Sequence, residues 1–250
     1  MRAFFTDLLE TFTEEHFLRG VCGKYHYQDT DYQSLFETAE RMLPLMREQA
    51  CWNHRLFELS GGQGIPAGRY TEAAFTLGKG LDLLQEEYAG KGALSECYMV
   101  EALASELLLQ AYAAYNSRVA EETAYHVARY HFLGSEAAYP LSALPELLKR
   151  LEMPVSCNGA FCMIPKKSVA FVTELTAEET VRCPGICVGC KGPAGRSCPN
   201  RVEEGLQLGR LIADMTDVPL SYGYSRIFGR RQEGLFSFIR ETERERQQPP

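Results

Sequence analysis

One long helical pattern constrains the fold of this 250-residue chain more than any other feature. From Leu94 to about Val119, apolar residues recur every three or four positions, which is the spacing of one helix face. These residues are Met99, Val100, Leu103, Leu107, Leu108 and Ala111. The same stretch is the chain's nearest approach to a membrane span, but Glu101 and Glu106 interrupt its apolar character. The pattern therefore predicts a long helix of a globular fold, and we expect no membrane partner.

Shorter helical and β-like segments surround this helix in irregular order. Helical spacing covers residues 3–12, 35–46, 81 onward, 144–151 and about 202–215. β-like segments cover residues 52–59, 70–77, 155 onward and 168–175. Residues 20–32 are interpreted as a tyrosine-rich loop, and Asn158-Gly159 predicts a hairpin turn in which both residues have positive φ. The predicted class is α+β, with an antiparallel or mixed sheet and flanking helices.

Composition and charge exclude several classes of protein. Apolar residues make up 45% of the chain and charged residues 24%, which is typical of a globular protein with one large domain or two small ones. The formal net charge is −7, so no overall positive field attracts nucleic acid or an anionic membrane. The first residues include Asp7, where a secretory signal needs an apolar core. We therefore expect a cytoplasmic protein that binds no nucleic acid.

Four of the nine cysteines form the most specific chemical motif in the chain. Cys183, Cys187, Cys190 and Cys198 have the spacing C-x3-C-x2-C-x7-C, within a segment rich in glycine. Thiols stay reduced in the cytoplasm, where a cysteine cluster indicates metal binding or catalysis rather than disulfide bonds. Four thiolates suit either a tetrahedral zinc ion or an iron–sulfur cluster. We therefore predict that these four cysteines bind a metal.

The identity of the metal stays open between two alternatives. Zinc sites usually combine two C-x2-C pairs, whereas here only Cys187 and Cys190 have that spacing. The compact arrangement favours a [4Fe–4S] cluster over zinc, with four free thiols as the remaining alternative. The first three cysteines also match the spacing of radical enzymes that use S-adenosylmethionine, but a fourth cysteine would close the open iron that such enzymes need. A cluster would transfer single electrons, whereas zinc would stabilise the loop.

The other motifs carry weaker signals. The pattern Gly62-x-Gly64-x-x-Ala67 precedes a predicted strand rather than a helix, so it fails the structural test for dinucleotide binding. Gly78-Lys79-Gly80 lies between a strand and a helix but lacks the Ser or Thr of a phosphate-binding loop, which favours a tight turn. Lys166-Lys167 is interpreted as a solvated turn. His126 and His131 are expected at the surface or in loops, and no catalytic group follows from the five histidines.

Four stretches of the chain carry a resemblance to a known family. Thr76-Leu77-Gly78 followed by Leu81-Asp82-Leu83-Leu84 forms a strand–turn–helix pattern, and Tyr98 to Ser105 begins the long helix. Arg129 to Gly134 comes next, and Cys162-Met163-Ile164-Pro165-Lys166-Lys167-Ser168-Val169 contains the pattern Met-x-Pro-x-x-Ser-Val. In this order, over residues 18–201, the stretches resemble the activation domain of cobalamin-dependent methionine synthase in its stand-alone form. The stand-alone relatives also carry a cysteine cluster after the last stretch, as this chain does.

The resemblance implies a corrinoid partner and a methyl donor. The family's domain binds S-adenosylmethionine over the cobalt of cobalamin, and one electron with a methyl transfer restores methylcobalamin from inactive Co(II). Arg129 and Gly134 lie where the family places its S-adenosylmethionine loop, so the resemblance assigns them to cosubstrate binding. The acid that would hold the cosubstrate's ammonium falls at Leu109 or Ala113, which carry no charge. We further hypothesise that a cluster in the cysteine loop supplies the electron.

These inferences define an expected organisation and three hypotheses for function. Residues 1–90 are expected to form the N-terminal helical and strand region of the fold, residues 91–180 its activation-domain-like core, residues 181–200 the metal loop, and residues 201–250 a C-terminal helix and charged tail. The leading hypothesis is an accessory protein that reactivates or handles a corrinoid methyltransferase system. The alternatives are a non-catalytic, zinc-stabilised module that binds a corrinoid or methyltransferase partner, and an iron–sulfur electron-transfer protein without a methyl-donor site.

Overall fold

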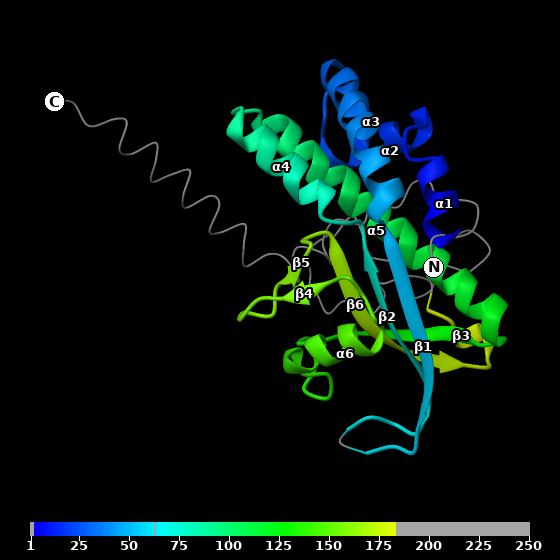
Figure 1. The fold of residues 1–250 in the computed structure, drawn as a ribbon. Coiled ribbons are helices and arrows are strands. Elements are labelled where there is room, and N and C mark those ends of the chain that lie inside the picture. Colours follow the sequence, from blue (N-terminus) through cyan, green and yellow to red (C-terminus); the bar gives the residue numbers. More distant parts are fainter. Residues whose placement is uncertain (1–2, 63, 184–250) are drawn as a thin grey trace, which may run out of the picture. The chain divides into compact units, whose positions relative to one another are not determined.

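The computed structural model describes residues 3–62 and 64–183 (Figure 1). In this part of the chain the helices are α1 (Ala3–Glu10), α2 (Glu15–Tyr25), α3 (Tyr32–Gln49), α4 (Gly80–Gly90), α5 (Leu94–Thr123) and α6 (Leu144–Arg150). The strands are β1 (Cys51–Leu59), β2 (Gly68–Thr76), β3 (His126–Phe132), β4 (Ser156–Cys157), β5 (Met163–Ile164) and β6 (Ser168–Thr176). Short 3₁₀ turns are η1 (Asp29–Asp31), η2 (Leu141–Ala143) and η3 (Glu179–Val181).

The four long strands form one antiparallel sheet in the order β1-β2-β6-β3. β1 and β2 are a hairpin, and β6 lies between β2 and β3, so strands that are distant in sequence meet at the centre of the sheet. β4 and β5 form a separate two-stranded hairpin. Figure 1 shows the helices α1–α5 gathered on one side of the sheet, with α6 on the other. This arrangement confirms the predicted α+β class with an antiparallel sheet and flanking helices.

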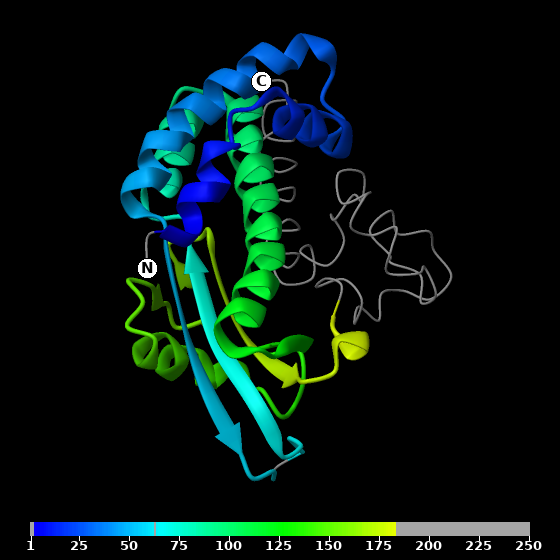
Figure 2. The same cartoon turned by 90° about the vertical axis from the view of Figure 1, so that its right-hand side faces the viewer.

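Both faces of the sheet are buried at its two central strands, β2 and β6. On one face, Phe75 of β2 and Phe171 of β6 make ring contacts with Tyr112 and Tyr115 of α5. Figure 2 shows α5 running lengthwise along this side of the sheet. On the other face, alternate residues of β2 and β6 form a second apolar cluster with α6, including Leu148. Because side chains on both faces are covered, β2 and β6 are buried almost without interruption instead of alternating between buried and exposed residues.

The long helix predicted from residue 94 is α5, which continues to Thr123 and ends where Ala124 adopts a left-handed conformation with φ 58°. The predicted strands at residues 52–59, 70–77 and 168–175 are β1, β2 and β6 within two residues at each end. The interpretation of residues 20–32 as a loop is wrong, because α2 continues to Tyr25 and η1 follows. Tyr25 belongs to α2, and Tyr27 lies in the short connection to η1; both contact Tyr98 of α5.

The predicted two-residue turn at Asn158-Gly159 is also wrong. The β4–β5 loop instead contains five residues, Asn158 to Cys162, and its left-handed residue is Phe161, with φ 57°. The Asn158 side chain explains this shape, because its Oδ1 accepts hydrogen bonds from the amides of Ala160 and Cys162 at 3.0 and 2.9 Å. An asparagine that binds the following amides in this way holds the loop without a positive φ of its own.

Candidate functional site

Strand β3 places Arg129 at the edge of the sheet. A register shift between Val127 and Arg129 puts Arg129 opposite Glu174 of β6. The Arg129 side chain is 54% exposed, and its Nη2 lies 3.4 Å from Oε1 of Glu136 in the loop after the strand. An ion pair this exposed contributes at most about 1 kcal/mol. Arg129 is therefore fixed by a strand, while its guanidinium remains accessible to a ligand.

His131, two residues further along β3, shares the same carboxylate. Its Nδ1 lies 3.1 Å from Glu136 Oε1, and its Nε2 lies 3.9 Å from Oε2 of Glu174. The residue is only 5% exposed, which makes the expectation of a surface or loop histidine wrong. The reason is that residues 126–132 form a strand whose alternate side chains turn toward the α6 side of the sheet.

An aromatic ring completes this group of side chains. Tyr139 stacks on His131 with ring centroids 4.4 Å apart and ring planes 23° apart. Burial, followed by the neighbouring Tyr70 and the carboxylates of Glu136 and Glu174, raises the pKa of Tyr139 to about 12. Its hydroxyl therefore stays neutral at physiological pH. We call Arg129, His131, Glu136, Tyr139 and Glu174 the Arg129 site.

Gly134 shapes the loop that carries Glu136 and Tyr139. It has a φ of 87°, in the left-handed region that favours glycine, and its amide donates a 2.7 Å hydrogen bond to the Tyr139 carbonyl. A Cβ at this position would lie 3.1 Å from Cβ of Leu141. The structure thus brings Gly134 next to the Arg129 site, where it positions the loop through its backbone.

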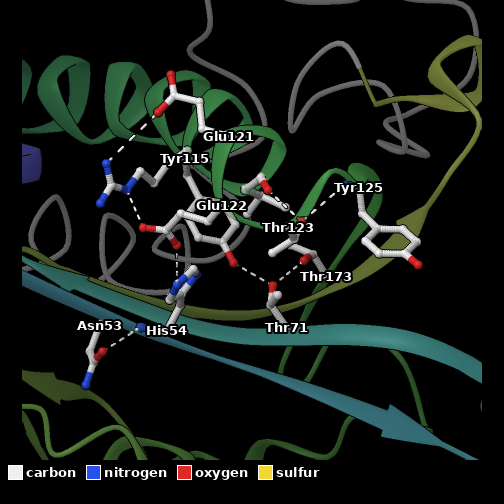
Figure 3. A network of polar contacts seen from close by, with 11 residues as sticks. Asn53, His54, Thr71, Tyr115, Glu121, Glu122, Thr123, Tyr125 and Thr173 are labelled. Carbon is white, nitrogen blue, oxygen red and sulfur yellow. Dashed lines mark hydrogen bonds and ion pairs between the residues drawn. The ribbon is translucent and has the colours of Figure 1, made fainter.

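On the opposite face of the sheet, a buried hydrogen-bond network connects β2 and β6 to α5 (Figure 3). The Thr71 hydroxyl lies 2.5 Å from both the Tyr115 hydroxyl and the Thr173 hydroxyl. All three residues are at most 1% exposed. Thr173 and Glu174 are consecutive on β6, so their side chains project to opposite faces of the sheet. The strand that carries Glu174 is therefore stabilised by hydrogen bonds on the face opposite to Glu174.

A histidine–carboxylate pair extends this network toward β1, as Figure 3 also shows. His54 Nε2 lies 3.0 Å from Oε2 of Glu122 on α5, and Oε1 of the same carboxylate lies 2.6 Å from Nε of Arg118. Burial lowers the pKa of His54 below its ordinary value, and the negative Glu122 opposes that shift only in part. The pair joins the end of α5 to the edge strand of the sheet.

Three of the four stretches that carry the family resemblance meet at one place. Ser168 donates a 2.8 Å hydrogen bond to the Thr76 hydroxyl, and Lys167 forms an ion pair with Glu101 of α5. The Lys167 side chain is only 7% exposed, so the interpretation of this lysine as part of a solvated turn is wrong. A buried ammonium needs an anionic partner, and α5 supplies it. These stretches therefore form a structural junction between β2, α5 and β6.

The glycines at residues 78–80 form a tight turn, as predicted. Gly78 has a φ of 91°, and its amide donates to the Thr76 hydroxyl at 3.2 Å. The Gly80 amide donates to Oε1 of Gln49 at 2.8 Å. Both amides are satisfied within the protein, so this turn offers them to no anion.

Of the four cysteines predicted to bind metal, Cys183 is the one within the described residues. Its amide donates a 2.6 Å hydrogen bond to the Val127 carbonyl of β3, and its carbonyl accepts one from Nδ2 of Asn116 on α5 at 3.3 Å. Cys187, Cys190 and Cys198 lie outside the described residues. Within residues 3–62 and 64–183, no group of three or more His, Cys, Asp or Glu side chains could hold a metal ion. The metal site therefore stays a prediction, with its first residue anchored beside β3.

Arg129 and Gly134 were predicted from the sequence, whereas the other members of the Arg129 site were not. One signal for Glu174 is present in the sequence, since it is the single charged residue in the apolar run of β6. Similarly, His131 follows Arg129 at the two-residue spacing of a strand face. Their pairing with Glu136 and Tyr139 depends on the register of β3 and on the loop after it, which no local pattern reveals.

Among the described helices, none is both long and apolar enough to cross a membrane.

Comparison with known proteins yields one structural similarity to report. No protein-family model matches the chain, and no curated protein matches it. Seven chains of solved structures match, among them the crystal structure of the MetH reactivation domain bound to AdoHcy. That alignment has 18% sequence identity and a TM-score of 0.40. It covers 58% of this chain and 65% of the other, slightly less than two thirds of that domain's length. The comparison therefore shows a distant similarity of fold.

Proposed function

We propose that this protein binds S-adenosylmethionine at the Arg129 site and serves the reactivation or handling of a corrinoid methyltransferase system. The observation that carries the proposal is the half-exposed Arg129 guanidinium, held on a rigid strand by one exposed 3.4 Å pair with Glu136. A ligand carboxylate can replace Glu136 at little cost and bind the guanidinium through two parallel hydrogen bonds. The amino-acid end of S-adenosylmethionine carries such a carboxylate.

The sequence supports the corrinoid context. The resemblance to the activation domain of cobalamin-dependent methionine synthase places Arg129 and Gly134 in the S-adenosylmethionine loop. In this protein Gly134 shapes the loop that brings Glu136 back to Arg129. Under the proposal, the bound methyl donor is presented to a corrinoid carried by a partner protein, either a corrinoid protein or a cobalamin-dependent methyltransferase.

We also propose that the cysteine quartet binds a metal. The donor set of Cys183, Cys187, Cys190 and Cys198 suits a [4Fe–4S] cluster or zinc. The backbone of Cys183 is hydrogen-bonded to β3, the strand that carries Arg129. A bound cluster would supply one-electron transfer, whereas zinc would hold the loop in a fixed conformation.

Isothermal titration calorimetry with S-adenosylmethionine tests the proposal. We expect the full chain to bind with a dissociation constant well below 1 mM, and Arg129→Gln to weaken binding by about 10- to 100-fold, because a charged hydrogen-bonding partner is lost. Arg19→Gln is the matched control, since Arg19 is 51% exposed and forms a similar 3.3 Å pair with Glu15 on α2. Binding at about 1 mM or weaker to the unmodified chain would refute the methyl-donor site.

Metal analysis after anaerobic purification separates the remaining alternatives. Iron and sulfide with broad visible absorption, lost in a Cys187→Ser, Cys190→Ser double variant, would identify a redox cluster. Together with a failed S-adenosylmethionine titration, that result would favour an electron-transfer protein. Zinc in a colourless protein, together with the same failure, would favour a non-catalytic binding module. Absence of both metals would overturn the metal prediction.

A further inference from the structure

Two hydrogen-bond acceptors face each other in the Arg129 site, one on the buried His131 ring and the other on the half-buried Glu174 carboxylate. A carboxylate only accepts hydrogen bonds when ionised, so the His131 Nδ1 that contacts Glu136 at 3.1 Å carries the ring hydrogen. In the neutral ring, Nε2 then presents a lone pair. This Nε2 is buried, has no hydrogen-bond partner, and lies 3.9 Å from Oε2 of Glu174. Two acceptors at this distance repel each other unless a donor lies between them.

We propose that a ligand's α-ammonium is the donor that lies between His131 Nε2 and Glu174. One nitrogen that makes hydrogen bonds of about 2.8 Å to two acceptors spans up to about 4.6 Å between them at tetrahedral geometry, so 3.9 Å is within reach. An ammonium also supplies the positive charge that balances Glu174. A proton on Nε2 alone would be too far from Oε2 for a good hydrogen bond.

The neighbouring Arg129 defines the chemical class of this ligand. Arg129 lies directly opposite Glu174 across the strands, so a cationic group and an anionic group stand side by side. An α-amino acid end has the complementary pair, with its carboxylate and ammonium on one carbon. The structure thus assigns the carboxylate to Arg129 and the ammonium to Glu174 and His131.

This assignment accounts for a feature that the sequence left without explanation. The ammonium-binding acid implied by the family resemblance falls at Leu109 or Ala113 of α5, which carry no charge. Leu109 is 5% exposed and packs in the core, so it offers no polar group to a ligand. In this chain the acid comes instead from β6. The identity of the ligand as a nucleoside derivative rests on the proposed function. Recognition of its amino-acid end rests on the side chains of the Arg129 site alone.

Calorimetry with three probes tests the inference on the full chain. The probes are S-adenosylhomocysteine, its analogue without the α-amino group, and L-methionine. We expect the des-amino analogue to bind about 10- to 100-fold more weakly than S-adenosylhomocysteine, because a charged hydrogen bond is lost. Glu174→Gln should weaken S-adenosylhomocysteine by a similar factor and leave the des-amino analogue almost unchanged. Glu178→Gln is the control, because Glu178 is an exposed carboxylate beyond the end of β6.

The outcomes separate this inference from the proposed function. Equal binding of S-adenosylhomocysteine and its des-amino analogue, with no effect of Glu174→Gln, would overturn the ammonium site while the methyl-donor site stands. Binding of L-methionine that depends on Glu174, without binding of S-adenosylhomocysteine, would overturn the proposed function and support the ammonium site. If neither amino acid probe binds, both are overturned. Circular dichroism of Glu174→Gln confirms that the variant is folded, as expected for a side chain that is 37% exposed.

Discussion

Replacing Glu72 with glutamine tests how much the ion pairs of this buried carboxylate stabilise the packing of α6 on the sheet. Glu72 lies on β2, with only 3% of its side chain exposed, and it accepts hydrogen bonds from two arginines. Arg150 of α6 donates to both carboxylate oxygens, at 3.0 and 2.7 Å, and Arg55 of β1 donates to one of them at 2.9 Å. In the glutamine variant the carboxamide NH₂ faces at least one arginine donor whichever way it turns.

The magnitude follows from what each partner loses. Hydrogen bonds to charged groups contribute about 1.5–3 kcal/mol each, and breaking a fully buried pair costs about 3–5 kcal/mol. Here Arg55 and Arg150 are 51% and 42% exposed, so water solvates them again and reduces the loss. We therefore expect Glu72→Gln to lower the free energy of unfolding by about 3 kcal/mol. For a folded domain of this size, a loss of about 3 kcal/mol corresponds to a fall in Tm of about 6–12 °C.

Urea unfolding followed by fluorescence measures this change. Trp52, the single tryptophan of the chain, lies on β1 and is 7% exposed, so its emission reports the unfolding of the sheet. Glu58→Gln is the matched control, because its 2.7 Å pair with Arg69 is exposed and should contribute less than about 1 kcal/mol. If Glu72→Gln and the control differ by less than 0.5 kcal/mol, as estimated at an unchanged m-value, the assigned role of the buried carboxylate is wrong.

Three further changes test other parts of the fold. Gly78→Ala should destabilise the protein by about 3 kcal/mol in the same urea assay, because its Cβ would lie 2.3 Å from Cβ of Gln49 at a left-handed φ; an unchanged midpoint would contradict this. Burial lowers the pKa of His54, so the unfolded chain takes up a proton at higher pH than the folded protein, and stability should fall as the pH drops from above 6.5. His54→Gln should have a shallower loss of Tm between pH 8 and pH 5, and an identical slope would exclude His54 as its source. Tyr115→Phe should cost about 1 kcal/mol in thermal unfolding, since one hydrogen bond to Thr71 is lost; a larger loss would indicate that the network is cooperative.

The elements of the fold that could be predicted are those whose patterns are local. The apolar spacing of α5 and the β-branched and aromatic residues of β2 and β6 identify these elements and their type. Strand β3 escaped prediction because its sequence, His-Val-Ala-Arg-Tyr-His-Phe, places polar residues among the apolar ones and contains a bulge after Val127. Its assignment as a strand depends on β6, which follows 35 residues later and offers it a free edge.

The candidate site divides in the same way. Arg129 and Gly134 could be selected because they belong to one short stretch with a family resemblance. Glu174 could not, because only the register between β3 and β6 places it opposite Arg129. The same holds for Lys167, whose burial depends on a carboxylate 66 positions earlier in the chain. Long-range pairing thus decides which charged side chains face a ligand and which are neutralised inside the protein.

The charges of the Arg129 site select between classes of ligand. The carboxylates of Glu136 and Glu174 contribute two negative charges and the guanidinium of Arg129 contributes one positive charge, so these three side chains carry one excess negative charge. A simple carboxylate would add a second negative charge in a partly buried environment, which is unfavourable. A zwitterion adds none, and its ammonium directly offsets Glu174 while its carboxylate replaces Glu136 on Arg129. The carboxylate of Glu136, once displaced, still accepts the hydrogen bond from His131 Nδ1 and so keeps the ring oriented. The arrangement therefore favours an amino-acid end over an acid of the same shape, because the zwitterion pairs with both Arg129 and Glu174 and adds no further net charge to the site.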